Sequence, residues 1–227
     1  MASQYMAQTS SADGFPLLIK GLLESGVKRA PEQEIVSGNQ NRFSYREFAE
    51  RVGRLASGLA SLGVERGDMV AIMDWDTHRY LECFFAVPMM GAVLHSVNVR
   101  LSAEQILYTI NHAEDDVILT NNELLPLLQQ IWDRVDAGKK LVLLSNDGKP
   151  TPSAQTPLFF DAEYEALLAA SSPWCDFPDF DENIRATTFY TTGTTGQPKG
   201  VYFSHTQTGA AHAIYPRRPG CNRARLV

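Results

Sequence analysis

Apolar residues in this chain follow helical spacing in some segments and form short uninterrupted groups in others, and the two patterns alternate. Residues 48–62 place apolar side chains three or four positions apart, which predicts one face of an amphipathic helix. Ser44 followed three residues later by Glu47 forms a capping box at the start of this helix. Ser102 and Gln105 form a second such pair and predict the start of a later helix.

Short apolar groups between the helical segments predict strands. The expected strands are residues 35–36, 42–43, 70–73, 92–97, 117–120, 141–145 and 187–190. The expected helices are residues 16–27, 44–63, 77–90, 102–113 and 123–135. Because parallel strands need a crossover connection, usually a helix, this alternation predicts an α/β fold with a parallel or mixed sheet wrapped by helices. Residues 146–157 are rich in small and turn-forming residues and are expected to form a surface loop.

Composition narrows the class of protein. With 227 residues, 44% hydrophobic and 20% charged, the chain has the composition of a soluble globular protein. A net charge of −6 argues against a nucleic-acid partner held by electrostatics. The three cysteines lie far apart, so neither a disulfide framework nor a zinc site is expected.

No targeting signal is expected from the sequence. Residues 1–15 lack the basic and apolar regions of a secretory signal and are expected to be flexible. The longest apolar run, residues 83–94, is too short to span a bilayer, so no transmembrane segment is expected. Together with the cysteine pattern, this predicts a cytoplasmic protein.

The most informative segment begins directly after the last predicted strand. Ten consecutive positions from Thr191 hold four threonines, three glycines, one proline and one lysine. Glycines let several backbone N–H groups approach one anion, threonine hydroxyls can bind a hard cation, and a lysine adds a positive charge. A loop at the carboxyl end of a strand is also where α/β proteins bind ligands. These properties predict a polyphosphate-binding loop.

The P-loop of nucleotide hydrolases does not account for this loop. That motif requires a glycine, four further residues and then Gly-Lys-Ser/Thr. Here Gly193 is followed after four residues by Pro198, and Lys199 is followed by Gly200.

The segment Tyr-Thr-Thr-Gly-Thr-Thr-Gly-Gln-Pro-Lys-Gly, residues 190–200, instead resembles the signature of the adenylate-forming, or acyl-activating, superfamily. Residues 78–82, 88–95, 98–102 and 202–205 resemble its medium- and long-chain fatty acyl-CoA synthetase branch. The resemblance implies that residues 16–207 are an incomplete N-terminal AMP-binding domain, a partial N-terminal domain of an adenylate-forming enzyme. Homodimers occur in the resembled branch, and a homodimer is left open here.

The chemistry implied by this resemblance has two steps and uses ATP, Mg²⁺ and coenzyme A. A carboxylic acid, expected to be a fatty acid, attacks the α-phosphate of ATP to give an acyl-adenylate and pyrophosphate. The thiol of coenzyme A then displaces AMP. An aryl-acid ligase or another adenylating enzyme remains an alternative within the superfamily, and a non-catalytic nucleotide-binding fragment is an alternative outside it.

The resemblance also implies roles for individual residues. Thr191 is expected to bind Mg²⁺, Lys199 is expected to be catalytic, and His205 is expected to be catalytic and to face the active-site cavity. A structural, hydrogen-bonded role for His205 is the open alternative. The expected ATP-binding residues are Thr191, Thr192, Gly193, Thr194, Thr195, Gly196 and Lys199.

The remaining candidate residues are interpreted as structural. His78, His95 and His112 lie on separate predicted elements and lack the spacing of metal ligands. Trp75 is expected at the end of a strand. Residues 114–116, Glu-Asp-Asp, are expected to form a solvated corner before the next strand.

Residues 208–227 form an atypical basic tail with four arginines and no acidic residue. Within this tail, residues 216–221 show neither helical nor strand periodicity, and the resemblance ends at residue 207. Codon degeneracy permits a frameshift after Gln207, and the tail is interpreted as its product. A genuine basic tail that binds a partner is the alternative.

Overall fold

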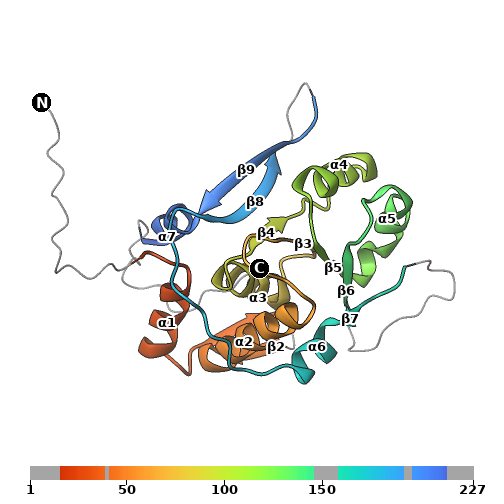
Figure 1. The fold of residues 1–227 in the computed structure, drawn as a ribbon. Helices are drawn as coiled ribbons and strands as arrows, with labels where there is room; N and C mark the ends of the chain where they lie inside the picture. Colours follow the sequence, from red (N-terminus) through yellow and green to blue (C-terminus); the bar gives the residue numbers. More distant parts are fainter. Residues whose placement is uncertain (1–15, 39–40, 146–157, 192–195, 214–227) are drawn as a thin grey trace, which may run out of the picture.

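A seven-stranded mixed sheet organises the chain in the computed structural model, which describes residues 16–38, 41–145, 158–191 and 196–213 (Figure 1). The strand order is β7-β6-β5-β3-β4-β8-β9. All neighbours are parallel except β8 and β9, which form an antiparallel hairpin. The strands are β3 (Met69–Met73), β4 (Val93–Ser96), β5 (Val117–Asn121), β6 (Lys140–Leu144), β7 (Ala162–Glu163), β8 (Arg185–Thr191) and β9 (Lys199–Ser204).

Helices cover both faces of this sheet. A separate two-stranded antiparallel sheet, β1 (Glu34–Ser37) with β2 (Asn41–Ser44), precedes the second helix. The helices are α1 (Lys20–Arg29), α2 (Tyr45–Ser61), α3 (His78–Met89), α4 (Ala103–Ala113), α5 (Leu125–Gln129), α6 (Tyr164–Ala170) and α7 (His205–Ala213). Two short 3₁₀ helices, η1 (Asn122–Leu124) and η2 (Trp132–Arg134), flank α5. The α/β fold with a mixed sheet wrapped by helices is therefore confirmed.

The core lies in two layers, one on each face of the sheet. Val70 and Ile72 of β3 pack with α2, α3 and α6, whereas Ala71 and Met73 pack with α4 and α5. Successive strand residues point to opposite faces, and all five residues of β3 are buried. The strand therefore shows an uninterrupted apolar run in the sequence.

The capping boxes place two helices as predicted. The Ser44 hydroxyl accepts a hydrogen bond from the Glu47 backbone N–H, and Ser102 does the same for Gln105. These caps satisfy N–H groups at the first turns of α2 and α4, which have no partner within the helix. The starts of both helices follow directly from the sequence.

The single helix expected at residues 123–135 is wrong, because η1, α5 and η2 occupy this segment. Pro126 lies in the first turn of α5. Proline has no N–H and clashes with the preceding turn inside a helix, so the α-helix begins anew just before it. The sequence prediction also missed β7 and α6, which are only two and seven residues long.

Several expectations fall partly or wholly outside the described residues. These are the flexible residues 1–15, the surface loop at residues 146–157 and the last fourteen residues of the basic tail. Helix α7 continues past residue 207 to Ala213, so the expected domain boundary lies within a helix. Within the described part of the chain, no helix combines the length and apolar character needed to cross a membrane.

Candidate functional site

The threonine- and glycine-rich segment forms the connection between β8 and β9. The hairpin pairs Tyr190 with Gly200 and, as its last pair, Thr191 with Lys199. Since β8 runs parallel to β4, this connection leaves the sheet at the carboxyl ends of the parallel strands. Residues 192–195, which include four of the seven expected ATP-binding residues, lie outside the described residues.

The described residues at the ends of this connection are accessible. Thr191 and Lys199 are exposed, and the Thr191 hydroxyl donates to the Lys199 carbonyl at 3.4 Å. Gly196 is also exposed, and a Cβ built on it would meet no atom within 4 Å. Thus the strand register brings a hydroxyl and an ammonium group of the predicted site to the same end of the sheet.

Tyr190, the residue before Thr191, is buried against aromatic side chains. The Tyr190 hydroxyl and Nδ1 of His112 lie 2.8 Å apart, and the Tyr190 ring lies 5.2 Å from that of His95. Across the hairpin, a Cβ on Gly200 would come within 3.3 Å of the Tyr190 ring. Only glycine allows this close approach of β9 without displacing the ring.

The buried side chains of His95 and Asp115 are paired on the inner side of this tyrosine. Nδ1 of His95 is 2.7 Å from Oδ2 of Asp115, and both side chains are almost completely inaccessible. Burial raises the pKa of Asp115, while the attraction to His95 opposes the rise. The solvated corner expected at residues 114–116 is therefore wrong for Asp115. Glu114 adopts a left-handed conformation with φ of 60° that ends α4, and the next side chain points into the protein.

His205 does not lie beside the phosphate-binding candidates. Ser204 pairs with Arg185 at the opposite end of β8 from Thr191, and His205 follows Ser204. The hairpin reverses the chain direction, and six residues of β strand cover about 20 Å. The expectation that His205 faces the same cavity as Lys199 is therefore not met.

The surroundings of His205 match the structural alternative instead. The ring is fully buried, Nδ1 accepts a hydrogen bond from the Ile19 backbone N–H at 3.4 Å, and Phe180 packs edge-on at 4.9 Å. Burial lowers the pKa of His205 to about 4, so the imidazole is neutral at pH 7. His205 thus joins the segment before α1 to the start of α7.

A second polar cluster, which the sequence interpretation missed, lies where β3 and β5 end. Asp74 is buried and accepts hydrogen bonds from the Asn121 amide at 2.7 Å and from the Thr77 hydroxyl. The chain leaves β3 toward β4 and leaves β5 toward β6, on opposite sides, so this is a switch point of the sheet. Polar residues directly after two buried strands were the available signal. Both carboxylate oxygens are already hydrogen-bonded, which indicates a structural connection between the two loops.

Two other residues near this edge have the structural roles expected of them. The Trp75 indole N–H donates to Glu123 at 3.1 Å just after β3. His78 packs against Phe43, with ring centroids 5.1 Å apart, and its Nε2 lies 3.9 Å from Glu165.

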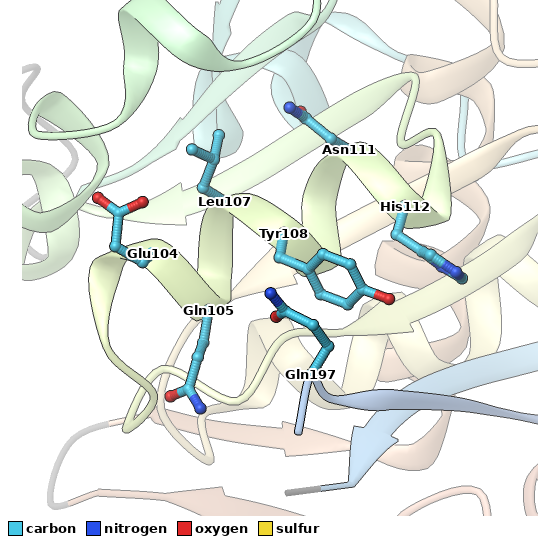
Figure 2. A pocket seen from close by; sticks show the side chains of 7 residues that line it. All are labelled: Glu104, Gln105, Leu107, Tyr108, Asn111, His112 and Gln197. Carbon is cyan, nitrogen blue, oxygen red and sulfur yellow. The ribbon is translucent and has the colours of Figure 1, made fainter. Parts of the chain in front are cut away.

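An open pocket of about 630 Å³ lies between α4 and the hairpin connection (Figure 2). One wall is the outer face of α4 from Glu104 to His112, and Gln197 forms the other. The Tyr108 and Gln197 side chains both point into this space in Figure 2. The pocket therefore adjoins the hairpin connection on the side of α4.

The sequence profile described as AMP-binding enzyme matches residues 23–223 of the chain. The chain belongs to the AMP-binding enzyme family. The superfamily indicated by residues 190–200 is thereby confirmed.

Curated relatives of this AMP-binding chain include ligases of several acids. It is 37% identical over 196 residues to medium-chain-fatty-acid–CoA ligase of Ectopseudomonas oleovorans, covering 85% of this chain and 35% of that protein. It is 39% identical over 187 residues to long-chain-fatty-acid–CoA ligase of Thermus thermophilus, covering 81% of this chain and 32% of that protein. It is 35% identical over 197 residues to 3-methylmercaptopropionyl-CoA ligase of Ruegeria lacuscaerulensis, covering 85% of this chain and 36% of that protein. The chain spans about a third of the length of these relatives.

Solved structures share the fold of this AMP-binding chain. The anthranilate CoA ligase AuaEII in complex with anthranoyl-AMP superposes with a TM-score of 0.75 at 19% identity, covering 84% of this chain and 36% of that one. ATP-bound MatB from Rhodopseudomonas palustris superposes with a TM-score of 0.72 at 22% identity, covering 88% of this chain and 37% of that one.

Proposed function

We propose that this chain is part of an ATP-dependent acid–CoA ligase that activates a fatty acid, and that residues 191–199 bind the phosphates of ATP. The observation that supports this most directly is the hairpin register, which pairs Thr191 with Lys199 at the carboxyl end of the parallel strands. The medium- and long-chain fatty-acid–CoA ligases among the relatives support the choice of acid.

The proposed residue roles follow from the charge that develops in adenylation. An oxygen of the substrate carboxylate bonds to the α-phosphorus, and the bond from that phosphorus to the bridging oxygen breaks, releasing pyrophosphate. Negative charge grows on the leaving group. The ammonium of Lys199 and the backbone N–H groups of residues 192–196 would donate to phosphate oxygens and stabilise that charge.

The second step needs a thiol. The sulfur of coenzyme A, having lost its proton, bonds to the acyl carbon, and AMP leaves with the electron pair of the acyl–oxygen bond. The adenylate supplies a far better leaving group than the free carboxylate does. This role for coenzyme A rests on the names of the relatives.

Thr191 is the proposed magnesium ligand among the described residues. Its hydroxyl is exposed next to Lys199. The described part of the chain has no group of three or more His, Cys, Asp or Glu side chains that could hold a metal ion. A hydroxyl with phosphate oxygens and water suits Mg²⁺, which seldom occupies an all-protein cage. When bound, the ion would neutralise phosphate charge.

Replacing the proposed phosphate-binding lysine tests the function. Lys199→Met keeps most of the side-chain length and removes the charge, so we expect Mg·ATP binding, measured by calorimetry, to weaken about tenfold or more. Lys28→Met removes an exposed lysine on α1 and is the matched control, with unchanged affinity expected. If the unsubstituted chain does not bind Mg·ATP, or if Lys199→Met binds it equally well, the proposal is wrong.

ATP–pyrophosphate exchange distinguishes the acid classes. We expect fatty acids to support more exchange than aryl acids at equal concentration. Because the chain spans about a third of the length of its relatives, we expect nucleotide binding by this chain to be more robust than exchange. Binding without exchange in any longer form of the protein would favour a non-catalytic nucleotide-binding function.

A further inference from the structure

Tyr190 is the last buried residue before the proposed phosphate-binding segment. Only 5% of it is exposed, whereas Thr191, the next residue, is exposed. Tyr190 pairs with Gly200 and Thr191 pairs with Lys199 across the hairpin, so a displacement of the Tyr190 backbone would also displace Thr191. The contacts that hold Tyr190 in place therefore help to hold Thr191.

Helix α4 holds Tyr190 through a polar contact. His112, in the last turn of α4, has Nδ1 2.8 Å from the Tyr190 hydroxyl, and the two rings meet at 90° with centroids 5.7 Å apart. Tyr108, one turn earlier, faces the edge of the Tyr190 ring at a centroid distance of 6.5 Å. His112 is exposed overall, and its ring also lies 5.2 Å from that of Tyr108. Ring contacts and the polar contact thus act together on this side of Tyr190.

The same helix also adjoins the far end of the connection. Gln197, two residues before Lys199, lines the pocket whose opposite wall includes Tyr108 and His112 (Figure 2). One face of α4 thus lies next to the residue before the connection and next to a residue near its end. On the inner side, His95 packs against Tyr190 and is held by its 2.7 Å contact with Asp115.

We propose that the hydrogen bond between His112 and Tyr190 positions Thr191, and Lys199 paired with it across the hairpin, for binding phosphate. This inference rests on the proposed function, because it assigns a purpose to the geometry at the base of the same segment. His112 acts through Tyr190 and is a positioning residue, not a catalytic one. Nothing in the resemblance or in the names of the relatives assigns a role to either side chain.

The alternative is that Tyr190 only fills space, and substitutions can separate the two roles. Tyr190→Phe keeps the ring and removes the hydroxyl, so a space-filling role predicts no change. His112→Ala removes the partner. His112→Asn keeps a polar atom near the position of Nδ1 and should restore most of the effect. Tyr108→Phe removes a neighbouring hydroxyl for which the described residues show no hydrogen bond, and is the matched control.

Two measurements on the full chain test the proposal. Amide hydrogen exchange over residues 190–200 should become about two- to tenfold faster in His112→Ala and Tyr190→Phe, the effect of losing one hydrogen bond, with the rest of the chain unchanged. The dissociation constant for Mg·ATP should rise by a similar factor in both. The double substitution should be no worse than either single one, since both remove the same interaction. His112→Asn and Tyr108→Phe should stay near the original values.

The other possible outcomes test the inference and the proposed function separately. Unchanged exchange over residues 190–200 in both variants overturns the inference, and so does exchange that rises equally across the whole chain. A local rise in exchange with unchanged Mg·ATP affinity shows that the pair does not serve phosphate binding, and also overturns it. Failure of the unsubstituted chain to bind Mg·ATP overturns the proposed function, while the exchange data still decide whether His112 holds the connection.

Discussion

His205 shows how burial sets the charge of a single side chain. It is fully buried, accepts a hydrogen bond from Ile19, and has its pKa lowered from an ordinary 6.5 to about 4 by burial. Protonation would place a positive charge where water cannot reach it. The folded protein therefore strongly favours the neutral ring.

This predicts a loss of stability in mild acid. Because the folded pKa is lower than the unfolded one, the unfolded chain binds the extra proton between pH 6.5 and pH 4, and stability falls as the pH falls through that window. His205 should contribute on the order of 2–3 kcal/mol to the difference in unfolding free energy between pH 7 and pH 4. His205→Gln cannot titrate, so its unfolding free energy, measured with urea, should depend less on pH. Equal pH dependence in the two proteins would contradict this assignment.

Single residues could be predicted where local sequence determines the geometry. The phosphate-binding roles of Thr191 and Lys199 stay predictions, and the hairpin register pairs the two residues. His205 was placed wrongly because the sequence does not show that β9 runs antiparallel and carries its end away from the connection. Asp115 was expected in solvent because its burial depends on the turn at Glu114 and on His95, which lies on another strand.

Between elements, α2 packs closely against α6 and against the segment that follows it. A Cβ built on Gly53 would lie 2.1 Å from the Pro173 carbonyl oxygen, and one on Gly58 would lie 2.8 Å from Leu167 Cγ. Backbone cannot withdraw from such a clash as a flexible side chain can. Glycine at position 53 is therefore required by the approach of the two segments, despite its poor helix propensity.

Gly53→Ala should accordingly destabilise the protein by about 2–3 kcal/mol, the cost of overpacking a closely fitted contact. Gly21→Ala on α1 is the matched control, because a Cβ there meets no atom within 4 Å. The control should leave stability unchanged or raise it by up to about 1 kcal/mol through better helix propensity. Urea denaturation checks both, and an equal effect of the two substitutions would show that the clash is relieved.

Elements were predictable where one strong local signal exists. The capping boxes predicted where α2 and α4 begin, and uninterrupted apolar runs predicted the central strands. The segment around α5 was misassigned because helical spacing outweighed a single proline, Pro126. Helix α6 spans seven residues and is stabilised mainly by packing on α2, β6 and β7, which a short sequence window does not reveal.

At the scale of the whole molecule, one ion network joins three helices that are distant in the sequence. Arg51 of α2 donates to both oxygens of Glu82 in α3, at 2.6 and 3.2 Å, and to both oxygens of Glu165 in α6, at 3.0 and 2.9 Å. Tyr164 donates to Glu82 at 2.6 Å. Burial alone would raise the pKa of Glu165, but the interactions with His78, 3.9 Å away, and with Arg51 outweigh it and lower the pKa to about 2.

Glu165→Gln should therefore lower the unfolding free energy at pH 7 by about 1 kcal/mol, a modest value because solvent reaches 36% of the side chain and screens the pair. The folded pKa lies below the unfolded value of 4.5, so this contribution is present above pH 4.5 and is lost as the pH falls toward 2. The difference between the two proteins should shrink over that range. Glu24→Gln, in an exposed pair with Lys28, is the control and should show no measurable difference at any pH.

The fold class was predictable from the alternation of elements, whereas the strand order was not. Helices between apolar runs indicated a parallel sheet, and the pairing of β4 with β8 joins residues 94–96 to residues 187–189. Which distant strands become neighbours depends on packing over the whole sheet.

The hairpin formed by β8 and β9 has a consequence for the order of folding events. Its paired strands are neighbours in the sequence, so closing this turn costs little chain entropy, whereas docking it on β4 must close a loop from residue 96 to residue 187. The hairpin can therefore nucleate before the rest of the sheet captures it. Thr191 and Lys199 would then pair early in folding. The slower docking of the hairpin on β4 would follow.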